Sequence, residues 1–492
     1  MRRLHHLSAV LLLAVAVFGS GGTGDSAFGI WDSESAESES STLNSQPSTL
    51  NPEGEEQEAF VVIKAARVIT LAGREQPRGE IVLADGKIRL AGTELEYPKA
   101  AKVIDARGEV VMPGLILPRT RWQLPAYSRS GVHGDQGAAQ EIFLEEIDFQ
   151  PLLEAGFTAV CFYPAGTGIS GPAAVYRTAG KTENRAMGTA YLRMTMSSPG
   201  RDKQVLRQAI DKARKEIEKV EQARKAWEEK QKKAQEEAAK KKPAEPAGKP
   251  EGEKKTEPGK DQDGKKEPKS EIPNPKSQIP NPEPVPQQKQ EPEKFVPPKI
   301  DPAVQPLVDW IRDKKGPALL FELASASDLR HLDDVLERSP EIPRMLLYLE
   351  RSPAGDYHHV VAELGSRKAI VLAHPLLGEL PDTATRYNLP AELAAAGCTL
   401  VLLPQVDAAS ELKYVRSRLA DLVRAGLPRE EALKAVTLGA AKVLGIQDRL
   451  GTIEKGKDAD VIFLDGDPLA PETRVTRVMI GGEIVWEAPK RP

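Results

Sequence analysis

The sequence predicts an α/β protein, with a parallel sheet covered by helices and a smaller β-module assembled from both ends of the chain. In the central part, short apolar strands alternate with amphipathic helices, which is the pattern of a parallel sheet with helices outside it. Strands of another kind, separated by tight turns, occupy residues 59–113 and return at 448–488. A β-module split between the chain ends, with the β/α region 114–447 inserted into it, accounts for both observations.

The composition limits the classes of partner. The 492 residues carry a net charge of −4, so nothing global argues for nucleic acid or a membrane surface. The 40 prolines and the 28% of charged residues indicate that a sizeable fraction of the chain is unpacked. The two cysteines, Cys161 and Cys398, lie in apolar runs with no CxxC partner, and we interpret them as buried thiols.

Residues 1–22 have the pattern of a secretory signal peptide. Two arginines precede the apolar run LSAVLLLAVAVFG, and small residues follow it. The apolar run is shorter than a typical membrane span, although an uncleaved anchor is the alternative. We therefore expect a secreted or periplasmic protein. Residues 23–58 are rich in Ser, Glu, Gly and Asn and offer no apolar face, so we expect a disordered spacer.

Order is expected to begin near Phe60. The segments FVVIKAARVITL, GEIVLADGKIRLAG and AKVIDARGEVVMPG are predicted strands, with turns at Gly73, Asp85-Gly86 and Arg107-Gly108. At the other end of the chain, LGTIEKGKDADVIFLDGDP and RVTRVMIGGEIVWE have the same strand character. These segments predict the composite module, which we expect to be a small β-sandwich.

The β/α region supplies the remaining predicted elements. Its strands are FTAVCFYP, GPALLFEL, RMLLYLE, KAIVLAHP and CTLVLLPQ. The helices that alternate with them are PLLEAG, SASDLRHLDDVLER, DYHHVVAELG, LPAELAAAG, ELKYVRSRLADLVRAG and PREEALKAVTLGAAKVLG.

An insertion at residues 201–300 interrupts this alternation. Residues 201–242 read as a charged helix with many Glu/Lys pairs four positions apart, and its first half, up to about Trp227, is the part that can pack on the β/α region. Residues 243–299 are rich in Pro, Lys, Glu and Gln and contain IPNP twice, so we expect them to be disordered or extended.

Three stretches of the sequence resemble the amidohydrolase superfamily, and most of all its secreted, imidazolonepropionase-like members. The first is the tail, GAAKVLGIQDRLGTIEKGKDADVIFLDGDPL followed by RVTRVMIGGEIVWE. The second is VIDARGEVVMPGLI with the strands before it, and the third is LLEAGFTAVCFYPAGTGISGPAAVYRTAG. Together they cover about residues 60–190 and 305–488.

The resemblance implies a fold, an activity and a cofactor. The fold is a distorted (β/α)8 TIM-like barrel carrying a small β-sandwich. The activity is hydrolysis of non-peptide C–N bonds, often in cyclic amides, with one or two divalent metals at the C-terminal ends of the barrel strands, where β/α barrels carry their chemistry.

The first metal-ligand motif of the family is replaced in this chain. The family pattern after PGLI is D-x-H-x-H, and here PGLI is followed by LPRTR, residues 117–121. Arg119 and Arg121 therefore stand at the two histidine positions and Leu117 at the aspartate position. A guanidinium has no lone pair to offer a cation, so we expect no bound metal and no cofactor from this motif.

The mid-barrel ligands implied by the resemblance are replaced as well. In LLFELASASDL, Phe321 and Leu323 fall at the histidine positions, and we expect Glu322, between them, to point the other way. After the next strand, Glu350 stands where the family places a histidine.

Two further residues are candidates for the site. Asp407 matches the aspartate that the family uses at the end of the final barrel strand to bind metal and accept a proton, although a helix N-cap is the bland interpretation. His374 ends the strand KAIVLAHP and either lines the pocket or is a hydrogen-bonded structural histidine. We interpret the GTGISG run at 166–171 as a glycine-rich turn, with an anion cradle as the alternative.

Three readings of function follow. The first is a catalytically impaired amidohydrolase-fold protein, a pseudoenzyme, whose arginines at 119 and 121 would favour a small anionic ligand such as a carboxylate or phosphate. The second is an active hydrolase with a rebuilt site that uses Glu322, Glu350, His374 and Asp407. The third is an interaction protein that uses the charged insertion.

Overall fold

The computed structural model describes residues 60–126, 129–240, 294–343, 346–380 and 382–489. The predicted signal peptide and spacer lie outside the described residues, as does the stretch 241–293 of the insertion. Within the described ranges, none of the helices combines the length and the apolar character that crossing a bilayer requires.

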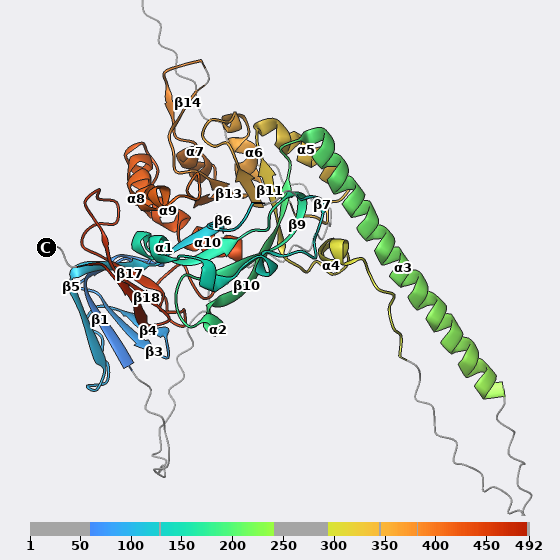
Figure 1. Cartoon of the computed structure of the whole chain (residues 1–492), viewed down its shortest axis with the longest axis horizontal. Helices are drawn as coiled ribbons and strands as arrows, with labels where there is room; N and C mark the ends of the chain where they lie inside the picture. Colours follow the sequence, from blue (N-terminus) through green and yellow to red (C-terminus); the bar gives the residue numbers. More distant parts are fainter. Residues whose placement is uncertain (1–59, 127–128, 241–293, 344–345, 381, 490–492) are drawn as a thin grey trace, which may run out of the picture. The chain divides into compact units, whose positions relative to one another are not determined.

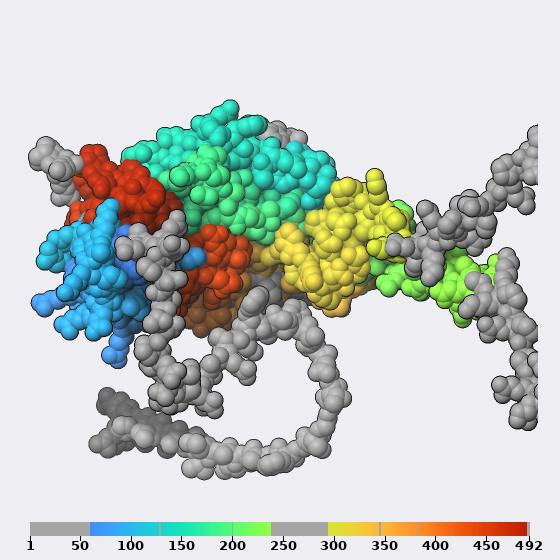
Figure 2. Space-filling model, turned by 90° about the horizontal axis from the view of Figure 1, so that it is seen from below, coloured from blue at the N-terminus to red at the C-terminus, as the bar shows by residue number. Residues whose placement is uncertain are grey.

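One mixed sheet joins strands from both ends of the chain, which confirms the predicted pairing of the two end regions (Figure 1). The strand order is β19-β18-β17-β5-β1-β3-β4, with β2 paired to β1. Its strands are β1 (Phe60–Val68), β2 (Gln76–Pro77), β3 (Glu80–Ala84), β4 (Lys87–Gly92), β5 (Lys102–Pro113), β17 (Val461–Leu464), β18 (Val475–Ile480) and β19 (Glu483–Glu487). In Figure 2 the blue and red ends of the described chain lie against each other accordingly.

The register of this sheet corrects one predicted turn. Asp85 and Gly86 both have positive φ and connect β3 to β4, as expected. Arg107 and Gly108, in contrast, lie inside the continuous strand β5. The β1–β5 pairing shifts register between Ala65 and Arg67, so the extra residues in β5 form a bulge and not a turn.

The second sheet is the curled sheet of a distorted TIM-like barrel, which confirms the predicted fold class. Its order is β16-β13-β12-β11-β10-β9-β8-β6, with β7 paired to β9. Strands β10, β11, β12, β13 and β16 pair in parallel, whereas β9 is antiparallel to both of its neighbours. The strands are β6 (Leu115–Thr120), β7 (Ser130–Val132), β8 (Phe157–Phe162), β9 (Thr167–Arg177), β10 (Ala186–Thr195), β11 (Ala318–Leu323), β12 (Leu346–Leu349), β13 (Ile370–Ala373) and β16 (Thr399–Leu402).

Helices cover the outside of this sheet. The longer ones are α1 (Gln150–Ala155), α4 (Gln305–Asp313), α5 (Ala326–Leu336), α6 (Val361–Ser366), α7 (Leu389–Ala395), α8 (Ala409–Arg424), α9 (Arg429–Ala435) and α10 (Leu438–Leu444). The short elements are α2 (Thr182–Arg185), the hairpin β14 (Gly378–Glu379) and β15 (Arg386–Tyr387), and the 3-10 turns Ala138–Gln140, Leu144–Glu146, Pro302–Val304 and Tyr357–His359.

Strands and helices form where their apolar patterns require burial. Every residue of β8, FTAVCF, is buried, as are all four of β12, because both faces of a sheet covered by helices are removed from water. Helix α5 begins where the Asp328 carboxylate accepts hydrogen bonds from the backbone N–H groups of Ala324 and Ser325, at 2.9 and 2.8 Å.

The curled sheet ends at β6 and β16, and other contacts join these two strands. Near the start of β6, the N–H of Ile116 donates to the carbonyl of Val436, which follows α9, at 2.9 Å. Helix α10 also packs against both β6 and β16. The connection between α9 and α10 therefore occupies the edge of β6, where it pairs with a backbone N–H group that a further strand would otherwise bind.

The glycine run in GTGISG is neither a turn nor a cradle. It lies within β9, and a Cβ at Gly168 would meet the carbonyl oxygen of Gly131 at 2.3 Å. A Cβ at Gly171 would meet the backbone of Gln136 at 2.2 Å. Glycine is required at positions 168 and 171 because the backbone of residues 131–136 packs directly against them.

Helix α3 (Pro199–Lys240) begins the insertion, as predicted. Its side chains Leu206, Ile210 and Ala213 are buried, and the helix packs against α4 and α5. Further along, the ring of Trp227 lies 5.8 Å from that of Phe295 in the returning segment. The packed part of the helix therefore extends about as far as the sequence indicates.

Arg177 ties the mixed sheet to the barrel. Its guanidinium lies 2.8 Å from the Asp458 carboxylate and 3.2 Å from that of Asp460. The Asp460 side chain is 1% exposed, and it also accepts a hydrogen bond from the N–H of Gly481 at 2.8 Å. Burial raises the pKa of Asp460, and the Arg177 guanidinium opposes that rise. The barrel strand β9 thus supplies the cation that a buried aspartate near β17 needs.

Replacing Arg177 with methionine should lower the free energy of unfolding by about 3 kcal/mol, because the substitution leaves the Asp460 carboxylate buried without its cation. Urea denaturation of the purified protein measures this change. The control, Arg107→Gln, removes an exposed pair with Asp105 and should barely move the urea midpoint. Equal shifts in the two variants would contradict this role for Arg177.

Candidate functional site

Polar side chains from successive barrel strands meet inside the curled sheet. Arg119 lies on β6, Arg193 on β10, Glu322 on β11 and Tyr348 on β12. Glu322 is the register partner of both Thr195 and Tyr348 on its two parallel neighbours, so the side chains of these three residues project to the same face. His374 follows β13 directly.

Arg119, Glu322 and Arg193 form a triad, called here the arginine–glutamate triad. Arg119 donates from Nε and Nη2 to Oε1 of Glu322, at 2.9 and 2.6 Å. Nε of Arg193 lies 2.8 Å from Oε2 of the same carboxylate. The Glu322 side chain is 4% exposed, against 14% for Arg119 and 11% for Arg193. One buried carboxylate is therefore shared between two guanidinium groups.

The triad keeps all three of its groups charged. Burial alone would raise the pKa of Glu322, but the guanidinium groups of Arg119 and Arg193 outweigh it and hold the pKa below its usual value. Burial disfavours the charged Arg119 as well, yet the Glu322 carboxylate keeps the pKa of Arg119 above its usual value. The triad thus carries one net positive charge.

Aromatic rings surround Arg119. Its Cζ lies 4.1 Å from the ring centroid of Tyr163 and 4.3 Å from that of Tyr348. The Tyr163 ring also has Cζ of Arg193 at 5.0 Å. Burial raises the pKa of Tyr348, so its phenol stays neutral. Guanidinium groups stacked on aromatic faces are stabilised by the ring electrons, and their orientation is restricted.

His374 is a buried, neutral side chain that belongs to this layer. Its Nε2 lies 3.2 Å from the Tyr348 hydroxyl and 3.2 Å from the carbonyl of Glu350, and its Nδ1 lies 3.2 Å from the carbonyl of Leu403. A neutral ring that donates from Nδ1 to Leu403 and accepts at Nε2 from Tyr348 satisfies both nitrogens. Burial lowers the pKa of His374. The structure thus places His374 inside the barrel and gives both ring nitrogens partners.

Arg121, the second arginine of the motif, turns away from the triad. Its Nη1 lies 3.0 Å from the Glu141 carboxylate and donates to the carbonyl of Tyr163 at 2.7 Å. Its Nη2 donates to the carbonyl of Pro125 at 2.6 Å. These contacts bind the loop after β6 to the end of β8, so the two motif arginines have separate ion-pair and hydrogen-bond partners.

Asp407 follows β16 in the chain, and its carboxylate reaches the end of the first barrel strand, β6. It does not act as a helix N-cap. Its carboxylate accepts hydrogen bonds from the Thr120 hydroxyl and from the N–H of Arg121, the latter at 2.8 Å. Helix α8 begins after Ala408 without a side-chain cap. Asp407 therefore bonds the segment after β16 to β6, at the opposite end from the Ile116–Val436 hydrogen bond.

One predicted orientation was wrong. Glu322 points into the barrel toward Arg119, so by strand alternation the buried Phe321 and Leu323 face the opposite side. The sequence could not show which way the Glu322 side chain points, because apolar residues lie on both sides of it. A strand that is buried on both faces has no alternation of polar and apolar residues. Glu350, also a predicted site residue, has an exposed side chain after β12.

The divalent metal implied by the resemblance does not fit these residues. Arg119 and Arg121 cannot donate a lone pair, and the Glu322 carboxylate is bound by two guanidinium groups. His374 and Asp407 are each committed to other hydrogen bonds. Within the described ranges, no group of three or more His, Cys, Asp or Glu side chains is placed to hold a metal ion. The donor set is that of an ion-pair cluster.

Three residues of the site were not predicted from the sequence: Tyr163, Arg193 and Tyr348. Arg193 is the most informative, because a charged residue within the apolar strand AYLRMT needs a buried partner. Together with the glutamate in LLFEL, it could have indicated an ion pair between neighbouring strands.

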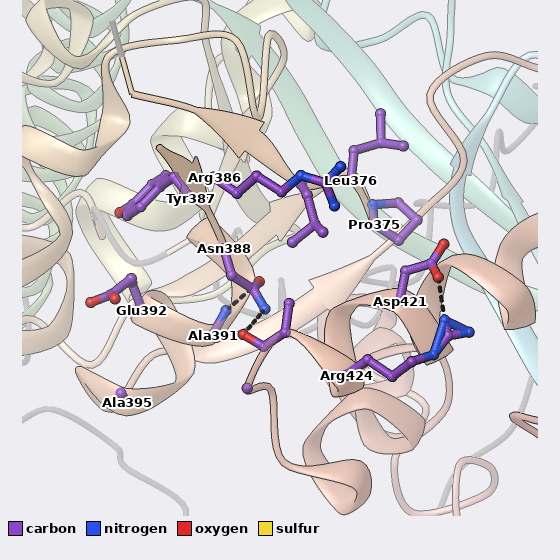
Figure 3. A pocket seen from close by; sticks show the side chains of 13 residues that line it. Pro375, Leu376, Arg386, Tyr387, Asn388, Ala391, Glu392, Ala395, Asp421 and Arg424 are labelled. Atoms are coloured by element: carbon purple, nitrogen blue, oxygen red, sulfur yellow. Dashed lines mark hydrogen bonds and ion pairs between the residues drawn. The ribbon is translucent and has the colours of Figure 1, made fainter. Parts of the chain in front are cut away.

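A separate cavity of about 840 Å³ lies outside the barrel. Its walls come from the segment after His374, from β15 and α7, and from the end of α8. Figure 3 shows Asp421 facing Arg424 on one wall and Asn388 beside Ala391 on another. None of the predicted site residues lines this cavity.

The neutral state of His374 predicts a pH-dependent stability. Because its folded-state pKa is lowered, the unfolded chain takes up a proton first as the pH falls below the ordinary value of 6.5. Stability should therefore decline from that value downward. Thermal unfolding as a function of pH, compared between the parent protein and His374→Gln, should show the stability difference narrowing as the pH falls. A constant difference would contradict a neutral His374.

Comparison with known proteins supports the fold that these residues occupy. A model of the amidohydrolase family matches residues 384–485. A solved amidohydrolase from Thermotoga maritima MSB8 superposes with a TM-score of 0.60 at 19% identity, covering 87% of this chain and 100% of that one. This likeness shows the fold.

The sequence relatives match over short stretches. The imidazolonepropionase of Thermoplasma volcanium is 37% identical over 68 residues, which are 13% of this chain and 17% of that protein. The N-acetylglucosamine-6-phosphate deacetylase of Bos taurus is 42% identical over 62 residues, 13% of this chain and 14% of that protein. The chain thus aligns with less than a fifth of these relatives. The family match at residues 384–485, the short stretches shared with these relatives and the shared barrel fold together make this chain similar to members of the amidohydrolase superfamily.

Proposed function

We propose that this chain is a catalytically silent amidohydrolase-fold protein that binds a ligand and does not hydrolyse C–N bonds with a metal. The observation that carries the proposal is the arginine–glutamate triad, which fills the centre of the curled sheet with two guanidinium groups and one carboxylate. The names of the relatives indicate C–N hydrolysis, which makes an active hydrolase the alternative.

Electrostatics favours the silent form. Two unit charges at 4 Å interact by about 4 kcal/mol at an effective dielectric constant of about 20, and a divalent cation doubles the repulsion. A metal beside Arg119 would also have to compete with that side chain for the Glu322 carboxylate, which already receives two hydrogen bonds from it. Removing either partner would leave an unpaired buried charge, which is strongly destabilising.

The family match does not argue against this proposal. It spans residues 384–485, which contain Asp407 but none of the triad. Asp407 is consistent with a retained scaffold, because its carboxylate bonds β6 to the segment after β16. A rebuilt hydrolytic site made of Glu322, Glu350, His374 and Asp407 finds no support in the geometry, since Glu322 and Asp407 bind different partners.

We further propose that the protein is secreted or periplasmic. The support is the pattern of residues 1–22, with its basic start, apolar core and small residues. The spacer 23–58 would then separate the cleavage site from the ordered chain. Amino-terminal sequencing of the protein recovered from its native host would locate the cleavage, and a chain that still begins at Met1 would overturn signal removal.

The metal content of the purified full-length protein tests the proposed function. We expect zinc, iron and manganese far below one atom per chain by mass spectrometry, because the residues at the four histidine positions, Arg119, Arg121, Phe321 and Leu323, have no lone pair to donate. A protein of known zinc content, purified in the same way, is the positive control. Stoichiometric metal that is lost in Asp407→Ala would overturn the proposal and support an active hydrolase.

A further inference from the structure

The triad has one positive charge more than its single carboxylate balances. Two guanidinium groups share a single carboxylate, and the neighbouring Tyr348 and His374 are neutral. We propose that this charge is the binding site for a small oxyanion, a carboxylate or a phosphate, held by Arg119 and Arg193. The inference rests on the proposed function, because it assigns the ligand class to that same site.

The pairing of Arg119 with Arg193 differs from the pair that the motif suggested. Arg121 is committed to Glu141 and to the carbonyls of Tyr163 and Pro125. Arg193, in contrast, donates from Nη1 to the carbonyl of Gly166 at 2.6 Å and contacts Glu322 through Nε. Its Nη2 makes no hydrogen bond within the described part of the chain.

Arg119 offers a matching free edge. Its Nε and Nη2 are bound to Glu322, whereas its Nη1 makes no hydrogen bond to any described residue. Both arginine side chains are more exposed than the carboxylate they share, at 14% and 11% against 4%. The carboxylate is therefore the covered side of the triad, and solvent reaches the guanidinium side.

Tyr163 keeps the positive groups together. Its ring centroid lies 4.1 Å from Cζ of Arg119, 5.0 Å from that of Arg193 and 5.8 Å from that of Arg121. Guanidinium groups gathered around one ring cannot disperse into solvent as flexible surface arginines do. Nη1 of Arg119 and Nη2 of Arg193 are thus available as N–H donors to the oxygens of a carboxylate or phosphate.

The chemistry limits the size and charge of the ligand. A single net positive charge is neutralised by one carboxylate or by a singly charged phosphate group. The ring centroids of Tyr163 and Tyr348 lie within 4.3 Å of Cζ of Arg119, so we expect only a small anionic head group to reach the triad. Acetate and inorganic phosphate are therefore the simplest probes.

The first experiment titrates full-length, metal-free protein with acetate or phosphate by calorimetry, with sodium chloride at matched ionic strength as the reference. We expect saturable binding of at least one of the two oxyanions, together with a higher melting temperature than in chloride. Binding of acetate alone or of phosphate alone identifies the head group. No saturable binding of either overturns the inference.

Charge variants then separate binding from stability. Arg193→Gln makes the triad neutral and should weaken oxyanion affinity by about tenfold or more. Glu322→Gln adds a positive charge and should strengthen affinity by a similar factor, although both substitutions lower the melting temperature without ligand. Affinity that falls equally in both variants would indicate a structural role only and overturn the site.

Two further variants keep the test decisive. Arg193→Lys preserves the charge and should retain more oxyanion affinity than Arg193→Gln. If the glutamine variant does not fold, the lysine variant can be compared with the parent protein. Arg367→Gln removes a partly buried arginine paired with Asp333 and Glu363 on the outer helices and should leave affinity unchanged. Metal-free protein that ignores both oxyanions would overturn this site and leave the proposed function standing, whereas stoichiometric metal would overturn the proposed function itself.

Discussion

The carboxylate of Glu322 holds the interior of the barrel together, because it is the buried anion that pairs with arginines on two other strands, β6 and β10. It reaches Arg119 on the first barrel strand and Arg193 on the neighbouring strand, and both guanidinium groups then stack on Tyr163. A buried charge is tolerated only when it is paired and hydrogen-bonded. The positions of these side chains therefore depend on one another, and a metal has no place among them.

The fold could be predicted because its signals are local and repeated. Buried strands such as FTAVCF and the alternating helices indicate a covered parallel sheet without knowledge of the partners. The site could be predicted only in part. The motif pointed to Arg119, which lies in the arginine–glutamate triad. The directions of Glu322 and Arg121 depend on side chains far away in the sequence, namely Arg193 and Glu141. No short-range pattern carries that information.

The closure of the barrel shows the same limit. The curled sheet runs from β6 to β16, and its two end strands are joined by Asp407 at one end and by the carbonyl of Val436 at the other. The resemblance gave Asp407 a catalytic meaning, and in the structure its carboxylate accepts hydrogen bonds from the Thr120 hydroxyl and the N–H of Arg121. The position of Asp407 in the fold thus agrees with the resemblance, and its observed hydrogen bonds connect two strands of the barrel.

The shared carboxylate also has a consequence for substitutions in the arginine–glutamate triad. A histidine at position 119 would leave Glu322 with one guanidinium, and an apolar residue at 322 would leave two arginines buried against each other. Each single substitution among these residues gives a protein with an unbalanced buried charge, whereas simultaneous substitutions avoid that state. The stability effects of substitutions at these three residues should therefore be strongly coupled, so that changing them one at a time costs more than changing them together.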